Sequence, residues 1–156
     1  MYKEIKDSYV YNVAEMEIKY STKVKASERT KVKYSSELAE VFRRIYPDGT
    51  IEYCELSFAA LLNKQNQVLG IIRLGEGSAD GTSLNIHKAL QAALLCNARG
   101  IAICHNHPSG NLQPSRMDDD ITNKARQMCN VMGYQFIDHI ILSDESFYSY
   151  RDNGKL

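Results

Sequence analysis

One short segment constrains this chain more than any other. Residues 105–118 are HNHPSGNLQPSRMD, so two histidines stand two residues apart and an aspartate follows after ten intervening residues. In an extended strand, residues two apart point to the same side about 7 Å from each other, which lets His105 and His107 converge on one ion. Pro108 then directs the chain out of the sheet, and Asp118 returns from a helix start. Three protein ligands plus a position for water are typical of a catalytic zinc site.

Each half of this pattern also has a purely structural interpretation. Ser115 and Asp118 have the spacing of a capping box, and the acidic residues 118–120 suit the positive end of a helix dipole without any metal. Two histidines in an HxH pair can equally be surface or core imidazoles. The two signals occur together, with strand, Pro-Gly loop and helix start in the required order. The combination therefore favours a site for one divalent ion, zinc by preference.

The order of the expected elements predicts an α/β fold. Apolar residues at a period of two indicate strands, and apolar residues at helical spacing indicate helices. Asn85 and either Ser35 or Ser36 are expected helix caps, residues 63–66 a hairpin turn, and Gly100 and Gly133 helix stops. The expected strands are 14–20, 51–62, 67–74, 101–105, 134–142 and 146–150, and the expected helices are 36–45, 86–98 and 115–132. Such alternation is the signature of a three-layer domain with its site at strand ends.

Composition limits the classes of partner and compartment. The chain of 156 residues can bury one core, and its formal net charge of zero gives no global preference for nucleic acid or membrane. The first 20 residues contain scattered charges and no apolar run of the length that a signal peptide or a spanning helix needs. The four cysteines include no CxxC pair, which fits a reducing compartment. We expect a cytoplasmic protein.

A basic connector follows the expected first strand. From Lys19 to Lys33 there are six basic residues against Glu28 alone, and no aromatic residue lies between Lys23 and Lys33 for bases to stack on. An ordinary solvated stretch is the main interpretation, and a weak contact with a polyanion or partner is the alternative. We assign 1–35 to an N-terminal strand and basic connector, and 36–156 to one domain.

The segment HNHPSGNLQPSRMDDDIT closely resembles the JAMM signature HxHPxxxxxxSxxD, in the form found in the RadC-like branch of JAB/MPN domains. The resemblance extends over about residues 50–154, from ELSFAALLNKQNQVLG through IDHIIL to YSY. It implies a three-layer JAB/MPN fold related to cytidine deaminases, with a mixed sheet and flanking helices. It also implies one zinc ion bound by His105, His107 and Asp118, and a catalytic glutamate upstream.

The resemblance assigns that catalytic glutamate to Glu55. Alternation independently places Tyr53, Glu55 and Ser57 on one face of a strand, and Cys54, Leu56 and Phe58 on the other. A solvated strand glutamate is the structural alternative, with Glu52 and Glu76 as weaker rivals for the role. The resemblance further implies that the Ser115 hydroxyl stabilises an oxyanion, although the same hydroxyl can cap a helix.

The remaining candidates have simpler explanations. His139 matches a recurrent Asp-His pair of the RadC-like branch, and we interpret it as a core or second-sphere histidine. His87, in the first turn of the helix after Asn85, is expected to be exposed. Cys104 points away from His105 if the strand is regular, so it is not counted among the ligands.

Two functions remain open at this stage. The first is a metal-dependent hydrolase of the JAMM type that cleaves a peptide or isopeptide bond, with metal-activated water, a base and an oxyanion donor. The second is a DNA-repair-associated accessory protein, with nucleic acid as a weak partner. A scaffolding JAB domain is disfavoured because no ligand is missing. The contiguous letters HNH do not match the dispersed motif of HNH nucleases, and the H-x-E and P-C-x-x-C parts of zinc deaminases are absent.

Overall fold

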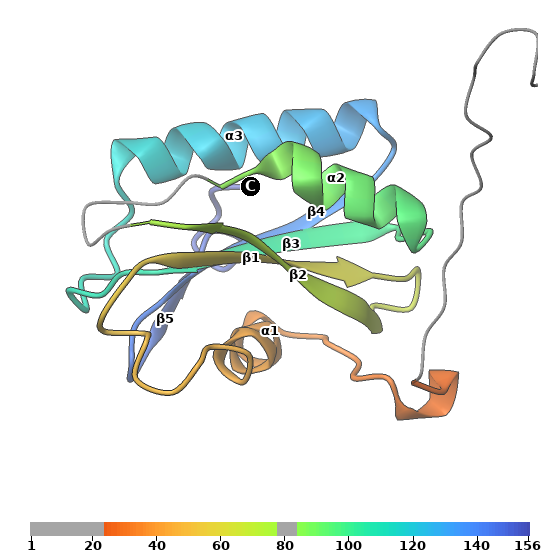
Figure 1. Ribbon diagram of the computed structural model, residues 1–156. Helices are drawn as coiled ribbons and strands as arrows, with labels where there is room; N and C mark the ends of the chain where they lie inside the picture. The colour runs from red at the N-terminus through yellow and green to blue at the C-terminus, as the bar shows by residue number, and fades with distance from the viewer. Residues whose placement is uncertain (1–23, 78–83) are drawn as a thin grey trace, which may run out of the picture.

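A mixed five-stranded sheet forms the centre of the computed structural model, which describes residues 24–77 and 84–156 (Figure 1). The strands are β1 (Leu56–Leu62), β2 (Val68–Glu76), β3 (Gly100–Asn106), β4 (Gln135–Leu142) and β5 (Phe147–Ser149). Their order across the sheet is β2-β1-β3-β4-β5. The β3–β4 pair is parallel and the other three pairs are antiparallel.

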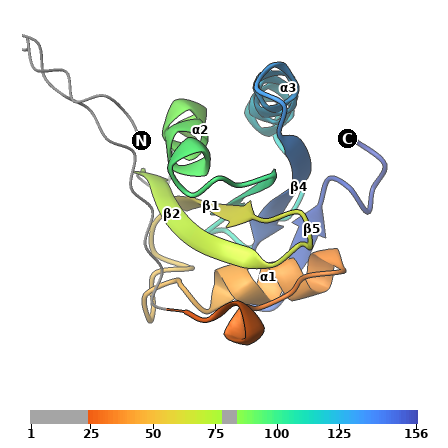
Figure 2. The same cartoon turned by 90° about the vertical axis from the view of Figure 1, so that its right-hand side faces the viewer.

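Helices cover both faces of this sheet and give it three layers (Figure 2). Helix α1 (Ser35–Arg43) packs against β4 and β5 on one face, after a short 3-10 helix η2 (Ala26–Glu28). On the opposite face, α2 (Ile86–Leu95) packs on β1 and β2, and α3 (Arg116–Val131) packs on β4. We call this second side the α2/α3 face. The three-layer α/β arrangement confirms the predicted fold class.

Alternation along the central strands divides the core in two. On β1, Leu56 and Phe58 join the cluster under α1, whereas Ala59 and Leu61 join the cluster under α2 and α3. Every residue of β1 and of β3 is buried, because both strands are covered on both faces. The carboxyl end of β3 is therefore held firmly by packing from above and below.

Two local predictions are confirmed. Asn63 organises the predicted hairpin turn, because its side-chain oxygen accepts hydrogen bonds from the N–H groups of Gln65 and Gln67, both at 2.9 Å. Asn85 caps α2, because its side-chain oxygen accepts from the N–H of Lys88 at 3.1 Å. Both are short-range interactions of the kind that sequence patterns carry.

Two helix boundaries differ from the prediction. The N-cap of α1 is Tyr34, because the Ser35 hydroxyl donates instead to Asp152 Oδ1 at 2.9 Å. The helix also ends at Arg43, before the predicted Ile45. Helix α2 ends at Leu95, where Asn97 takes a left-handed conformation with φ of 52° and turns the chain. Gly100, the expected stop, is the first residue of β3.

The predicted strand 51–62 is wrong over its first five residues. The side-chain amide of Asn106 donates to the carbonyl oxygens of Ile51 at 2.7 Å and Cys54 at 2.9 Å. Its oxygen accepts from the N–H of Leu56 at 2.8 Å. These bonds take the backbone groups that a longer ladder would need, so residues 51–54 form turns and β1 begins at Leu56.

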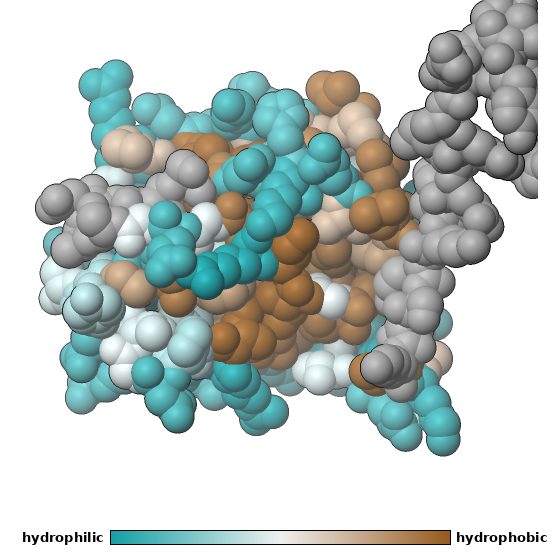
Figure 3. All heavy atoms as spheres, viewed as in Figure 1, coloured by the Kyte–Doolittle hydropathy of each residue, from teal (hydrophilic) through white to brown (hydrophobic). Residues whose placement is uncertain are grey.

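The β2 edge of the sheet exposes part of its apolar side chains (Figure 3). Val68, Leu69, Ile71 and Ile72 are each partly buried. Lys31 forms an isolated antiparallel bridge with Gln67, so the described residues before α1 pair with this edge at its start. The predicted strand 14–20 and the first part of the basic connector lie outside the described residues. Among the described helices, none is long and apolar enough to span a membrane.

Candidate metal centre

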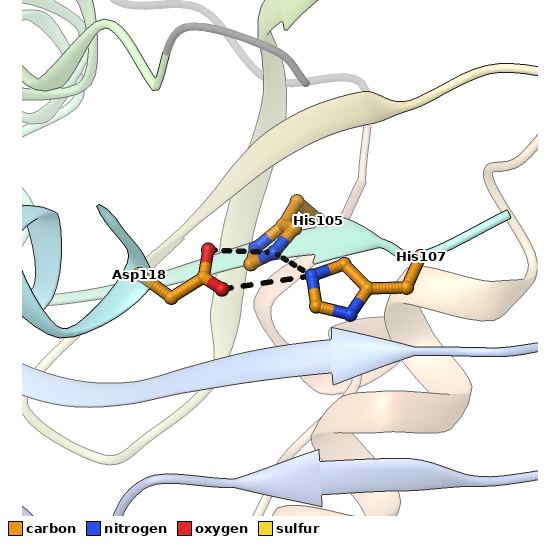
Figure 4. A group of neighbouring side chains, drawn as sticks. All are labelled: His105, His107 and Asp118. Atoms are coloured by element: carbon orange, nitrogen blue, oxygen red, sulfur yellow. Dashed lines mark hydrogen bonds and ion pairs between the residues drawn. The ribbon is translucent and has the colours of Figure 1, made fainter. Parts of the chain in front are cut away.

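Parallel pairing of β3 and β4 determines where the site lies. Since the two strands run in the same direction, their carboxyl ends meet at one end of the sheet, the usual place for a site in α/β folds. His105 is the penultimate residue of β3, and the N–H of His107 donates to the carbonyl of Leu142 at 2.8 Å. Helix α3 then brings Asp118, in its first turn, to face both histidines (Figure 4).

The three predicted ligands form a small triangle. Nε2 of His105 lies 3.0 Å from Nε2 of His107 and 3.0 Å from Oδ1 of Asp118. Nε2 of His107 lies 3.6 Å from Oδ2 of Asp118. Ligand atoms bound tetrahedrally to one zinc ion at about 2.0–2.1 Å stand about 3.3 Å apart, so these three side chains fit such an ion. In the part of the chain that the structure describes, they are the group of His, Cys, Asp or Glu side chains that could hold a metal.

His107 presents an acceptor to this triangle. Its Nδ1 lies 2.5 Å from the carbonyl oxygen of Asn111, which can only accept a hydrogen bond, so Nδ1 carries the proton. In the neutral ring, Nε2 therefore carries a lone pair and is able to bind a metal ion. In the protonated ring, Nε2–H donates to Asp118, and this hydrogen bond raises the pKa of His107. Burial opposes the rise, and the Asn111 carbonyl and the negative charges of Asp118 and Glu55 add to it. The site therefore attracts positive charge.

Asp118 belongs to the capping box and to the triangle at the same time. Its N–H donates to Ser115 Oγ at 3.2 Å, and its Oδ2 accepts from the Ser115 N–H at 2.7 Å and from the Ser115 hydroxyl at 2.6 Å. Oδ1 still faces His105. Burial alone would raise the pKa of Asp118, but its close contacts with the rings of His105 and His107 hold the pKa well below its ordinary value. The structural and metal-binding interpretations of this residue are thus compatible, and the cap fixes the carboxylate toward the histidines.

Glu55 lies next to β1 rather than within it. It immediately precedes the strand, is half-buried, and its carbonyl accepts from the Gly77 N–H at 2.9 Å. Ser57 pairs with His105 across β1 and β3. Extending that antiparallel register by two residues places Glu55 opposite His107, on the same side of the sheet as the triangle. The carboxylate is close enough for its charge to act on His107.

The two rival glutamates lie in other surroundings. Glu76 is exposed and forms an ion pair with Arg73. Glu52 is exposed and lines an open cavity of about 220 Å³ that also contacts His107 and Asp144. This cavity gives His107 direct access from solvent, whereas His105 is fully buried. A molecule reaching the triangle would approach from the His107 side.

Three polar residues near the site received little or no role from the sequence. Asn106 holds the segment that carries Glu55, as described above. His139 is fully buried on β4, with Nε2 2.9 Å from Nδ1 of His105 and Nδ1 2.6 Å from Oγ1 of Thr122. Burial lowers the pKa of His139 well below its ordinary value, and the charge of neighbouring His105 adds to the effect. Thr122 follows Asp118 by four residues, so helical spacing alone could have placed it beside the site.

His87 and Cys104 lie as predicted. His87 is exposed on α2, and Cys104 is buried under α1.

Comparison with known proteins identifies the family. Residues 32–155 match the family described as the RadC-like JAB domain. The chain belongs to the RadC-like JAB domain family. This RadC-like chain is 38% identical over 98 residues to a UPF0758 protein of Streptococcus gordonii, covering 63% of the chain and 43% of the relative. It is 33% identical over 121 residues to a UPF0758 protein of Geotalea uraniireducens, covering 78% and 52%.

These relatives extend beyond the shared region. The chain spans about half the length of the curated relatives it matches. Their names state no activity. The predicted resemblance is confirmed at the level of the family, and the division of the chain near residue 35 stays a prediction.

Proposed function

We propose that this RadC-like domain is a zinc-dependent hydrolase of amide bonds, in peptides or isopeptides. The observation that carries the proposal is the triangle of His105, His107 and Asp118. Glu55 stands two residues before Ser57, which pairs with His105. Two imidazole nitrogens and one carboxylate oxygen suit zinc, and three protein ligands leave a position open for water. The open cavity beside His107 supplies an approach for substrate.

The protein side chains divide the chemistry among them. When bound, zinc lowers the pKa of a water molecule from about 15.7 toward 7 and polarises the substrate carbonyl. Glu55 accepts the proton of the attacking water and later delivers it to the leaving amine. Glu55 is half-buried immediately before β1, and the proposal requires its carboxylate to contact the water and not the metal.

Ser115 has two tasks that compete for one proton. As an oxyanion donor, its hydroxyl must point toward the substrate carbonyl oxygen. In the structure the same hydroxyl donates to Oδ2 of Asp118 at 2.6 Å. The proposal therefore requires the hydroxyl to rotate during the reaction while its oxygen continues to accept from the N–H of Asp118.

Metal content tests the proposal most directly. Elemental analysis of protein purified without added metal should find close to one zinc per chain, and His107→Ala should lose most of it. His87→Ala is the matched control, because His87 is exposed on α2 and belongs to no metal-binding group among the described residues. A folded protein that is free of metal and takes up no zinc on titration would overturn the proposal.

Activity is the second test. Turnover of peptide and isopeptide libraries by the zinc-loaded protein should stop when a chelator removes the metal and should return when zinc is restored. If a protein that holds one zinc per chain cleaves neither peptide nor isopeptide bonds, the site is better described as a structural zinc site.

A further inference from the structure

The imidazole of His105 is held from behind by a buried chain of hydrogen bonds. Its Nδ1 lies 2.9 Å from Nε2 of His139, and Nδ1 of His139 lies 2.6 Å from the hydroxyl of Thr122. The Thr122 hydroxyl in turn lies 2.5 Å from the carbonyl oxygen of Asp118. His105 and His139 are fully buried and Thr122 is 2% exposed, so water does not compete for these groups.

The carbonyl oxygen of Asp118, at the end of this hydrogen-bond chain, determines which atom donates in each bond. A carbonyl oxygen cannot donate, so the Thr122 proton must lie between Thr122 and Asp118 to avoid two bare oxygens at 2.5 Å. The Thr122 oxygen is then an acceptor for His139, whose Nδ1 carries the proton. In a neutral imidazole the other nitrogen is an acceptor. Nε2 of His139 therefore accepts a hydrogen bond from Nδ1–H of His105.

We infer that Thr122 and His139 are positioning residues that fix the tautomer of His105, so that its Nε2 presents a lone pair to the metal triangle. This inference rests on the proposed function. It assigns a role to a histidine and a threonine that bind no metal themselves. A ligating histidine commonly donates its second ring N–H to a carboxylate or a carbonyl. Here His139 is the acceptor instead, and His139 is in turn hydrogen-bonded to Thr122 on α3.

Tyr150 fixes the orientation of the His139 ring. The two rings are stacked, with centroids 5.0 Å apart and an angle of 7° between their planes. The N–H of Tyr150 donates to the carbonyl of His139 at 3.1 Å, and its hydroxyl donates to Asp119 at 2.9 Å. The His139 ring is thus held between Tyr150 and His105. Asp118 and Thr122 are both on α3. The same helix therefore supplies one candidate ligand, Asp118, and the last residue of the hydrogen-bond chain that orients a second candidate ligand, His105.

Nuclear magnetic resonance of the metal-free protein tests the direction of the chain. Long-range proton–nitrogen spectra of ¹⁵N-labelled protein at about pH 8, above the ordinary pKa of histidine, distinguish a protonated from a bare ring nitrogen. His105 should show Nδ1–H and a bare Nε2, which is the opposite of the tautomer that free histidine favours in water. Nε2–H on His105 would overturn the inference, because that proton would occupy the metal side.

Zinc affinity of two matched variants tests the positioning role. Thr122→Val keeps the shape of the side chain but leaves Nδ1–H of His139 without its acceptor, and should weaken zinc binding by about 10-fold to 100-fold. Thr122→Ser keeps the hydroxyl and should restore binding to within a few-fold of the natural protein, together with the Nδ1–H signal. Equal zinc affinity of the natural protein and Thr122→Val would overturn the inference. A protein that shows the Nδ1–H tautomer and binds no zinc contradicts the proposed function while supporting the hydrogen-bond chain.

Discussion

The side chain of Asn106 and the backbone of Leu56 are joined by a hydrogen bond of 2.8 Å at the point where the β1–β3 ladder ends. Two further bonds run from the Asn106 amide to the carbonyls of Ile51 and Cys54. One buried side chain between the two histidines thus holds the backbone on both sides of Glu55. The last residue of β3, which stands between two candidate ligands, thus also determines where β1 begins, next to the candidate base.

Asn106→Ala should destabilise the protein by about 2–4 kcal/mol, because it removes three buried hydrogen bonds and leaves the Leu56 N–H without a partner. Urea unfolding gives the difference in free energy, and hydrogen exchange should show a faster Leu56 amide. Asn130→Ala, on the exposed side of α3, should stay within about 0.5 kcal/mol of the natural protein. Equal stability of the two variants would contradict the role of Asn106.

Gly100 provides a test of packing at the start of β3. A Cβ added there would lie 2.8 Å from Cδ1 and 2.9 Å from Cγ1 of Ile137, whereas a Cβ at Gly70 on β2 meets nothing within 4 Å. Gly100→Ala should therefore cost about 1–3 kcal/mol through overpacking. Gly70→Ala should be neutral or gain about 0.5–1 kcal/mol, because glycine within a strand is entropically unfavourable. Thermal unfolding of both variants distinguishes this effect from a general intolerance of alanine in the sheet.

The metal triangle could be predicted because its signals are local. The key residues lie within one stretch of fourteen, namely His105, His107, Pro108 and Asp118. The strand period, the proline and the helix cap each depend on residues only a few positions apart. The strand, the loop and the start of the helix could therefore be predicted from the local sequence. The capping box and the ligand set looked like alternatives in the sequence. In the structure the Asp118 carboxylate takes part in the capping box and also faces both histidines.

The surroundings of the triangle could be predicted only in part. Alternation predicts that Glu55 and Ser57 share a face, but the pairing of Ser57 with His105 depends on a register between segments about fifty residues apart. Asn106 ends β1 through bonds to that distant segment, and no local pattern encodes such a partner. Gly100 looked like a helix stop because glycine often ends helices. In the structure Asn97, in the left-handed conformation, turns the chain after α2.

Asp138 makes stability depend on pH in a defined direction. Its side chain is buried, and burial raises the pKa of the carboxyl although hydrogen bonds from Ser149 and from the backbone of Arg151 oppose the rise. The folded state then binds the proton more tightly than the unfolded state, so this residue stabilises the fold less as pH rises above about 4. Asp138→Asn keeps an acceptor oxygen and should become progressively more stable relative to the natural protein from about pH 4 to pH 7.

Chemical unfolding of the metal-free proteins across this range measures the effect. Asp48→Asn is the control, because Asp48 lies exposed in a turn. Its stability difference from the natural protein should not change in the same way. A difference for Asp138→Asn that stays flat, or falls as pH rises, would contradict the assignment.

Binding to DNA should be weak and strongly dependent on salt. The chain has zero net charge, and the described part of the connector contributes Lys25, Arg29, Lys31 and Lys33. If four cations each neutralise one phosphate, affinity should fall on the order of 100-fold between about 50 and 200 mM salt, without preference for sequence. Titration of labelled duplex and single strands at both salt concentrations measures this. Tight binding that persists at physiological salt would instead favour the accessory role in DNA repair over hydrolysis.

The last prediction separates ligand from base, since Glu55 and Asp118 are both carboxylates near His107. Asp118 faces both histidine nitrogens directly, so Asp118→Asn should weaken zinc binding and His107→Ala should lose it. Glu55→Gln should keep zinc, because Glu55 does not belong to the group of side chains whose ligand atoms converge on one ion. It should nevertheless reduce turnover by about 10²- to 10⁴-fold, since glutamine holds a water but accepts no proton from it.

Metal retention under a chelator challenge measures the first contrast without any known substrate. Glu52→Gln is the matched control, because Glu52 is an exposed glutamate beside His107 and should affect neither zinc nor turnover strongly. If Glu55→Gln releases zinc as readily as His107→Ala, Glu55 is a fourth protein ligand. The coordination shell would then have no position for water, and the domain would hold a structural zinc ion instead of a hydrolytic one.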